Sequence, residues 1–227
     1  MILHESKKSC IFANLCSETR FCFFNCVTTN KKLRTALLWI LFIYIMHDTN
    51  EEFKIEIARC REIYEKKAKD YGTSWRILRL PSLTDQIYIK ASRIRSIQES
   101  GENRVGDGVE PEFVAMVNYC VMALIQQELG PEGNQELPLE QAVALYDKHI
   151  TRATKLMRDK NHDYGEAWRM MRVSSMVDLI LMKLRRIKQI EDNHGKTLIS
   201  EGVEGGYMDI INYSLFCLIR ITESKEQ

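Results

Sequence analysis

The chain carries the sequence D-Y-G-x-x-W-R-x-x-R twice, beginning at Asp70 and again at Asp163. A guanidinium group binds two phosphate oxygens at once, and an aromatic ring can stack on a nucleobase. The motif therefore predicts a loop that offers cations to a phosphate. Its candidate ligand-binding residues are Arg76, Arg79, Trp168, Arg169 and Arg172. The structural alternative is that the tryptophans pack in the core and the arginines pair with the motif's aspartates.

Further charged residues follow each motif at i, i+5 and i+8, a spacing that places them in one sector of a helix. They are Asp85, Lys90 and Arg93 in the first occurrence and Asp178, Lys183 and Arg186 in the second. The lysines and arginines would extend the same anion site. The alternative is an ion network in which this sector faces the acids and amides of a third helix.

Two asparagines, Asn118 and Asn212, each interrupt an otherwise apolar helical stretch. A buried amide that lacks partners costs about 1–3 kcal/mol. We therefore expect each amide to share partners with the charged sector or with a ligand, and we count both as candidate ligand-binding residues.

Acidic residues at the start of the same stretches form a candidate metal site. The second stretch carries Glu201, Glu204 and Asp209, and the first carries Asp107 and Glu110. Ala115 stands in the first stretch where Asp209 stands in the second. Because Mg²⁺ prefers carboxylate oxygens, with water and phosphates completing its shell, the second set is the better candidate.

The two motifs belong to a tandem repeat. The stretches that start at Asp70 and Asp163 match without gaps at an offset of 93, and the match resumes from Asp107 at an offset of 94. Thirteen positions of the first stretch are identical in the second: Asp70, Tyr71, Gly72, Trp75, Arg76, Arg79, Ser82, Asp85, Ile87, Lys90, Arg93, Ile94 and Ile97. Two units are too few for an open solenoid, so we expect two similar units about a pseudo-two-fold axis.

The hydrophobic pattern predicts an all-α fold with three helices in each unit, and no segment alternates like a strand. The expected helices are 51–69, 82–99 and 111–129 in the first unit, and 139–159, 174–192 and 205–222 in the second. Gly72 and Gly165 should end the first helix of each unit in a left-handed conformation, and Ser82 and Ser174 should cap the second. The predicted domains are residues 46–129 and 138–227, joined by a linker at 130–137.

Residues 1–45 differ from the remainder of the chain. They contain four of the seven cysteines and a balance of +4, so the rest carries −3 of the net charge of +1. The apolar run at 36–46 is too short for a spanning helix, which needs about 20 residues. This extension is a membrane anchor, a cleaved signal, or a disordered or mis-assigned start upstream of Met46; we favour the last, since helical patterning begins right after Met46.

Composition excludes several classes of function. A net charge near zero argues against direct binding of duplex nucleic acid. No phosphate-binding glycine loop, metalloprotease motif, serine-hydrolase elbow or paired C-x-x-C occurs. We expect a cytoplasmic protein that does not bind a membrane unless the extension is genuine, and a homo-oligomer is compatible with the sequence.

The combination of D-Y-G-x-x-W, K-x-x-R and E-x-x-E-x-x-x-x-D-x-x-N-Y resembles the nucleotide-modification-associated domain of the first type, a bacterial and phage family of unknown function. The resemblance spans about residues 51–221, and it implies ligand roles for Lys160, Asp163 and Tyr164. The family is similar in helical layout to all-α nucleotide pyrophosphatases, which hydrolyse nucleoside triphosphates with carboxylate-bound Mg²⁺. Their paired E-x-x-E on the opposite helix is replaced here by Lys183 and Arg186, so hydrolysis follows by analogy alone.

We therefore expect a protein that binds a nucleotide or another phosphorylated small molecule. Arg169, Arg172, Lys183 and Arg186 would meet the phosphate, and the second acidic set would hold Mg²⁺. If the protein is an enzyme, the reaction would be metal-assisted hydrolysis of a phosphoanhydride. The alternative is a non-catalytic structural or interaction module in which the same charges form an interhelical network.

Overall fold

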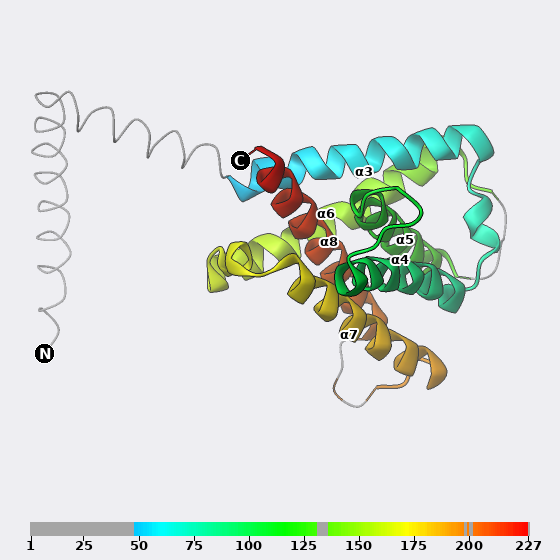
Figure 1. Ribbon diagram of the computed structural model, residues 1–227. Helices are drawn as coiled ribbons and strands as arrows, with labels where there is room; N and C mark the ends of the chain where they lie inside the picture. Colours follow the sequence, from blue (N-terminus) through cyan, green and yellow to red (C-terminus); the bar gives the residue numbers. More distant parts are fainter. Residues whose placement is uncertain (1–47, 131–135, 198, 200–201, 227) are drawn as a thin grey trace, which may run out of the picture. The chain divides into compact units, whose positions relative to one another are not determined.

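The computed structural model describes residues 48–130, 136–197, 199 and 202–226. Residues 50–227 form one compact unit, and the described residues contain helices and no strand. The helices are α3 (Thr49–Tyr71), α4 (Leu80–Ser100), α5 (Glu110–Leu129), α6 (Leu139–Tyr164), α7 (Val173–Asp192) and α8 (Gly202–Glu226), shown in Figure 1. The all-α tandem fold is as predicted. The predicted N-terminal extension lies outside the described residues.

The helices α3, α4 and α5 repeat in order as α6, α7 and α8. Helices α4, α5, α7 and α8 pack against one another, and α6 lies against both α5 and α8. The contacts between α4 and α7 are reciprocal: Lys188 Nζ lies 2.6 Å from Asp85 Oδ1, and Arg95 lies 3.5 Å from Asp178. Because Lys188 is the repeat counterpart of Arg95, the same contact is made twice, as a pseudo-two-fold axis requires.

The outer helices α3 and α6 also contact one another. The guanidinium of Arg61 donates to both carboxylate oxygens of Asp147, over 2.8 and 3.1 Å. Next to this pair, the rings of Tyr64 and Tyr146 lie 4.7 Å apart. Each first helix is thereby fixed against the first helix of the other repeat.

The core is centred on α5 and α8, which are apolar around most of their circumference. Fully buried side chains on these two helices include Phe113, Met116, Val117, Tyr207 and Ile211. Burial of one such side chain contributes roughly 1.5–3 kcal/mol, so these two helices supply much of the stability. Their central position also means that any polar group they carry must find a partner within the protein.

The first helix of each repeat ends as predicted, because Gly72 and Gly165 have φ values of +66° and +61°. The predicted serine caps are wrong: the residues that cap α4 and α7 are Arg79 and Arg172, and Ser82 and Ser174 lie inside the helices. The physical reason is the turn between the helices. A short 3-10 helix, η1 (Ser74–Ile77) or η2 (Ala167–Met170), precedes each cap and brings the start of the next helix forward.

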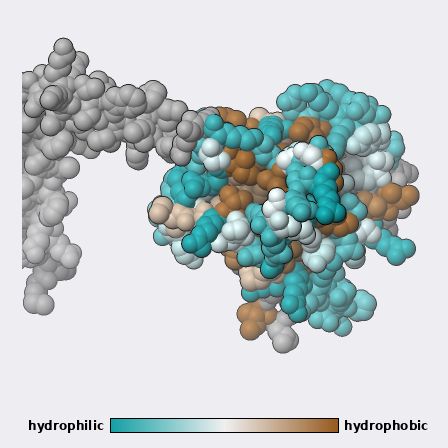
Figure 2. All heavy atoms as spheres, in the orientation of Figure 1, coloured by the Kyte–Doolittle hydropathy of each residue, from teal (hydrophilic) through white to brown (hydrophobic). Residues whose placement is uncertain are grey.

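The surface is mainly hydrophilic on the face seen in Figure 2, with hydrophobic side chains scattered among polar ones. Exposed apolar side chains recur at equivalent positions beside the 3-10 helices: Tyr71 and Ile77 in the first repeat, and Tyr164 and Met170 in the second. Within the described part of the chain, no helix combines the length and the apolar character needed to cross a bilayer.

Candidate functional site

Each repeat contains a hollow bounded by its first helix, its 3-10 turn and its third helix. We name the hollows by their repeat. The first-repeat hollow has a volume of about 540 Å³, and the second-repeat hollow has a volume of about 360 Å³. The first-repeat hollow is lined by Tyr64, Lys67, Tyr71, Trp75, Ala115 and Asn118. The second-repeat hollow is lined by Met157, Lys160, Tyr164, Trp168, Asp209 and Asn212. These six positions correspond one to one under the repeat, so the duplicated fold builds the same hollow twice.

The tryptophans of the D-Y-G motif form a wall of each hollow. Trp75 and Trp168 are 8% and 5% exposed, and the ring of Trp168 stacks on that of Phe216 at 4.2 Å. Their indole Nε1 atoms are buried and have no hydrogen-bond partner among the described residues. Each tryptophan is therefore both a core residue, as the structural alternative predicted, and a lining residue with an unused donor.

The edge of the second-repeat hollow is charged. Lys160 Nζ on α6 lies 2.5 Å from Asp209 Oδ1, and Lys183 Nζ on α7 lies 2.6 Å from Asp209 Oδ2. Three helices thus bring two cations and one anion to a single point, which leaves a local excess of one positive charge. Lys160 and Lys183 are the predicted ligand-binding residues that the structure brings together.

The equivalent charges of the first repeat are arranged differently. Lys90 and Arg93 pair with Glu112, over 3.1 and 2.7 Å. Glu112 lies one helical turn before Ala115, the counterpart of Asp209, so its carboxylate draws these cations to a different level of the helix. The counterpart of Glu112 is Gly206, where an added Cβ would lie 2.9 Å from the Ile187 side chain.

The two asparagines bind the protein backbone. Nδ2 of Asn118 donates to the carbonyl of Cys60 over 3.1 Å, and Nδ2 of Asn212 donates to that of Ala153 over 3.0 Å. The prediction that these amides share partners with the charged sector is therefore wrong for the amide nitrogens, which bind backbone carbonyls instead. The other half of each amide differs: Asn118 Oδ1 accepts a hydrogen bond from Tyr146 over 2.9 Å, whereas Asn212 Oδ1 is buried and has no partner among the described residues.

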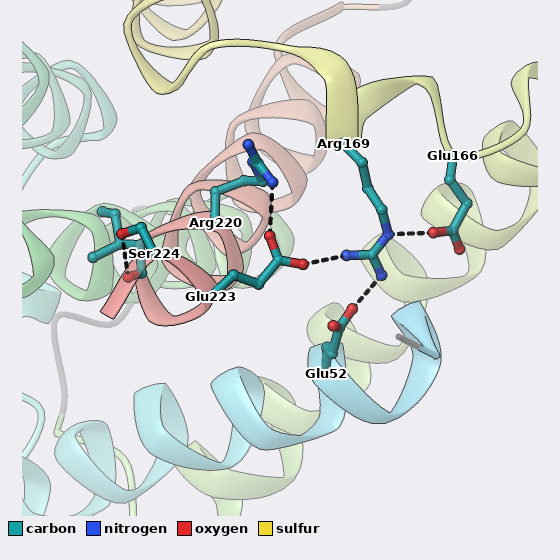
Figure 3. Close-up of polar contacts among 7 residues, drawn as sticks. Glu52, Glu166, Arg169, Arg220, Glu223 and Ser224 are labelled. Atoms are coloured by element: carbon teal, nitrogen blue, oxygen red, sulfur yellow. Dashed lines mark hydrogen bonds and ion pairs between the residues drawn. The ribbon is translucent and has the colours of Figure 1, made fainter. Parts of the chain in front are cut away.

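Arg169 does not point to an open phosphate site. Its guanidinium donates to Glu52 on α3, Glu166 before η2 and Glu223 on α8, as Figure 3 shows. Three carboxylates already accept hydrogen bonds from its donors, so a phosphate would have to displace them. The group ties the start of α3 to the end of α8.

Arg76, the counterpart of Arg169, is also internal. It is 2% exposed and donates to the side chain of Gln126, whose own amide donates to the carbonyl of Leu78 over 3.1 Å. Arg76 is part of η1, so its hydrogen bond to Gln126 on α5 holds this 3-10 turn against the core. A phosphate would reach Arg76 only if this side chain left its buried position, so the phosphate role of Arg76 stays a prediction without support from the geometry.

The remaining predicted ligand-binding residues lie at the surface. Arg79, Arg172 and Arg186 are exposed, and their side chains have no ion-pair or hydrogen-bond partner in the described part of the chain. Asp163 is exposed beside His162, at 3.0 Å, and Tyr164 is 76% exposed at the rim of the second-repeat hollow. Of these five, only Tyr164 lines a hollow.

The described acids of the predicted metal sites do not form a cation cage. Glu204 pairs with Arg152, and Glu110 lies 2.6 Å from Lys225 and 3.6 Å from Arg59. The hydrogen bond from Lys225 lowers the pKa of Glu110. At Asp107 the backbone carbonyl, and not the carboxylate, accepts a hydrogen bond from Arg93. Glu201 lies outside the described residues, among which no three metal-binding side chains cluster.

The carboxylates of Glu110, Glu204 and Asp209 are thus already paired with a lysine or an arginine. A cation would have to displace these partners, so the described donors do not fit a bound metal by themselves. The buried thiols offer no alternative chemistry: burial raises the pKa of Cys60 to about 12 and also raises the pKa values of Cys120 and Cys217. A thiolate would not form at neutral pH.

Two features of the hollows escaped the sequence analysis. Phe216 completes the aromatic wall of the second-repeat hollow, one turn after Asn212, but in the sequence it is one apolar residue among many. Glu191 on α7 accepts hydrogen bonds from Thr84 over 2.7 Å and from Tyr207 over 3.1 Å. Burial raises the pKa of Glu191, and this cluster joins α4 of the first repeat to α7 and α8 of the second.

Comparison with protein families identifies the family of this chain. The profile of the family described as nucleotide modification associated domain 1 matches it twice, at residues 67–127 and 160–221. The two matches together cover more than half of the chain and coincide with its two repeats. The chain therefore belongs to this family, a domain of unknown function, in a tandem form. No curated protein and no solved structure matches the chain.

Proposed function

We propose that the second-repeat hollow binds a nucleotide or a related phosphorylated small molecule. The observation that carries the proposal is the juxtaposition of an aromatic wall with two lysines that converge on one point. Trp168 and Phe216 offer apolar ring surface, and the hollow's volume of about 360 Å³ lies at the lower end of the range for small-molecule sites.

The phosphate would meet Lys160 and Lys183 at the edge of this hollow. Both ammonium groups are already oriented toward a carboxylate, and a phosphate group offers them the same kind of acceptor with more charge. Asp209 then competes with the ligand for the two lysines. Its removal should strengthen the binding of inorganic phosphate, as long as the protein stays folded.

Mg²⁺ enters this proposal only as the ion that accompanies a nucleotide. The carboxylates of Glu110, Glu204 and Asp209 are paired with cations, so we propose binding as the primary activity. Arg172 and Arg186 are exposed cations on the same repeat that would add to the attraction of an anion.

Isothermal titration of the full chain tests the proposal, with inorganic phosphate and a panel of nucleoside mono- and triphosphates, each with and without Mg²⁺. We expect binding that weakens at least tenfold in Lys183→Met. Lys188→Met on the same helix is the matched control and should change affinity less than twofold, because Lys188 faces Asp85 and Tyr88.

The competing function is a structural module in which the Lys160–Asp209–Lys183 group only joins α6, α7 and α8. It predicts no heat of binding for any nucleotide, together with a clear loss of thermal stability in Asp209→Ala. A pyrophosphate-release screen on the same panel would separate a binding protein from a hydrolase.

A further inference from the structure

The lysine and the arginine of the K-x-x-R motif converge on an internal anion in the first repeat. The carboxylate of Glu112 lies 3.1 Å from Lys90 Nζ and 2.7 Å from the guanidinium of Arg93. Glu112 is buried, and its two cations come from the neighbouring helix α4. The first repeat therefore shows what kind of group this pair of side chains holds, namely an anion with two oxygens.

The second repeat keeps the two cations and lacks this acid. The cations are Lys183 and Arg186, and Gly206 stands where the first repeat has the glutamate. The side chain of Ile187 already packs against this glycine, since an added Cβ would lie 2.9 Å from it. Lys183 turns to Asp209 at 2.6 Å, and Arg186 is exposed without an ion-pair or hydrogen-bond partner in the described part of the chain.

We propose that Lys183 and Arg186 form a slot for a second phosphate, which makes the ligand of the second-repeat hollow a nucleoside diphosphate or triphosphate. This proposal rests on the proposed function, in which Lys160 and Lys183 bind the first phosphate at the edge of the hollow. Residues three apart on a helix lie on one face, with their Cβ atoms about 5–6 Å apart. Lys183 would therefore contact both phosphates, and Arg186 would contact the second alone.

The charges of this edge suit a diphosphate better than a single phosphate. Lys160, Lys183 and Arg186 carry three positive charges against the one negative charge of Asp209. A guanidinium also binds two oxygens of one phosphate in parallel, as Arg93 and Lys90 share the carboxylate in the other repeat. A single phosphate held by the two lysines would leave this guanidinium unused.

The experiment compares inorganic phosphate with inorganic pyrophosphate by isothermal titration of the full chain. We expect pyrophosphate to bind wild-type protein about tenfold more tightly than phosphate, and this ratio should fall below about twofold in Arg186→Met. Arg185→Met is the matched control, because it removes the same charge from the adjacent, exposed position of α7 and should keep the ratio. Malonate, which also joins two anionic groups through one atom, tests whether carboxylates serve equally well.

A gain of binding in the first repeat is the second test. Glu112→Gln removes the internal anion from Lys90 and Arg93 while it keeps the shape of the side chain. We expect the number of pyrophosphate molecules bound per chain to rise from one to two, and circular dichroism verifies that the variant folds. A folded variant that still binds one molecule would contradict the proposal.

Three further results would overturn the slot: pyrophosphate binds no more tightly than phosphate, Arg185→Met lowers the ratio as much as Arg186→Met, or malonate binds as tightly as pyrophosphate. Nucleoside monophosphates test the proposed function separately, because they need only Lys160 and Lys183. If they bind and pyrophosphate has no advantage, the slot is refuted and the proposed function stands. If pyrophosphate binds through Arg186 and no nucleotide binds, the slot stands and nucleotide recognition is refuted.

Discussion

The two repeats share a backbone plan but place one acidic side chain a helical turn apart. In the first repeat Glu112 holds Lys90 and Arg93, and in the second Asp209 holds Lys183 and Lys160. The shift decides whether the edge of the hollow is charged. The helices of the two repeats thus pack in the same order, while the position of one acidic side chain gives the two hollows different chemistry.

A second difference concerns the buried amides. Tyr146 gives Asn118 its second hydrogen bond, and the counterpart of Tyr146 in the other repeat is Phe53, which has no hydroxyl. Phe53 instead packs edge-on against Phe216, with ring centroids 5.1 Å apart. Beside Asn212 there is therefore aromatic packing where a hydrogen bond stands beside Asn118, and Asn212 Oδ1 has no partner in the described part of the chain.

The largest expected effect is the loss of the satisfied amide. Asn118→Leu leaves the Tyr146 hydroxyl buried without its acceptor and should cost about 3 kcal/mol, whereas Asn212→Leu should cost about 1–2 kcal/mol. Cys217→Ala installs the residue that the first repeat carries at that position, Ala123, and should cost about 1 kcal/mol. Urea unfolding of the three variants checks the order, and a smaller loss in Asn212→Leu than in Cys217→Ala would refute the argument.

The next effect concerns the arginine group of Figure 3. Arg169→Met would leave Glu52, Glu166 and Glu223 facing one another without their shared cation, and should cost about 2–3 kcal/mol. The control is Arg220→Met, since Arg220 pairs with Glu223 at 2.8 Å, has no second ion pair among the described residues, and is more exposed than Arg169. Thermal melts at low and high salt measure both. Equal losses in the two variants would show that Arg169 is not the centre of the group.

The repeat and its helices could be read from the sequence because they depend on periodicity and on paired identities such as Trp75 and Trp168. The partners of the charges could not. Arg76 and Arg169 are identical in the sequence, yet one binds Gln126 and the other three glutamates that come from three separate segments. Such partners are fixed only when distant helices pack, and no local pattern encodes that.

The same limit applies to the candidate site. Lys160 and Lys183 were predicted as ligand-binding residues from a resemblance and a helical sector, but only packing shows that they converge on Asp209. One turn earlier stands Gly206, where an added Cβ would lie 2.9 Å from the end of the Ile187 side chain. A sequence shows a glycine at that position without showing what lies opposite.

A smaller effect follows from the unpaired amide. Phe53→Tyr gives the first repeat the residue that the second repeat carries at the equivalent position, Tyr146, and its hydroxyl would donate to Asn212 Oδ1. One recovered hydrogen bond should raise the free energy of unfolding by about 1 kcal/mol. Urea unfolding of Phe53→Tyr in the Asn212→Leu background is the control. A gain that persists there would come from packing and would contradict the hydrogen-bond argument.

The smallest effect concerns Glu191, whose repeat counterpart is Gln98. Burial raises the pKa of Glu191, so its contribution to stability is complete below the unfolded pKa of 4.5 and is lost as the pH rises through the folded value. Glu191→Gln keeps an acceptor for Thr84 and Tyr207 and removes the charge. It should therefore raise Tm by about 2 °C at pH 7.5 and give no advantage near pH 4. Melts across this range check it: a gain that is larger at pH 4 would reverse the sign and show that the ionised carboxylate stabilises the contact between the repeats.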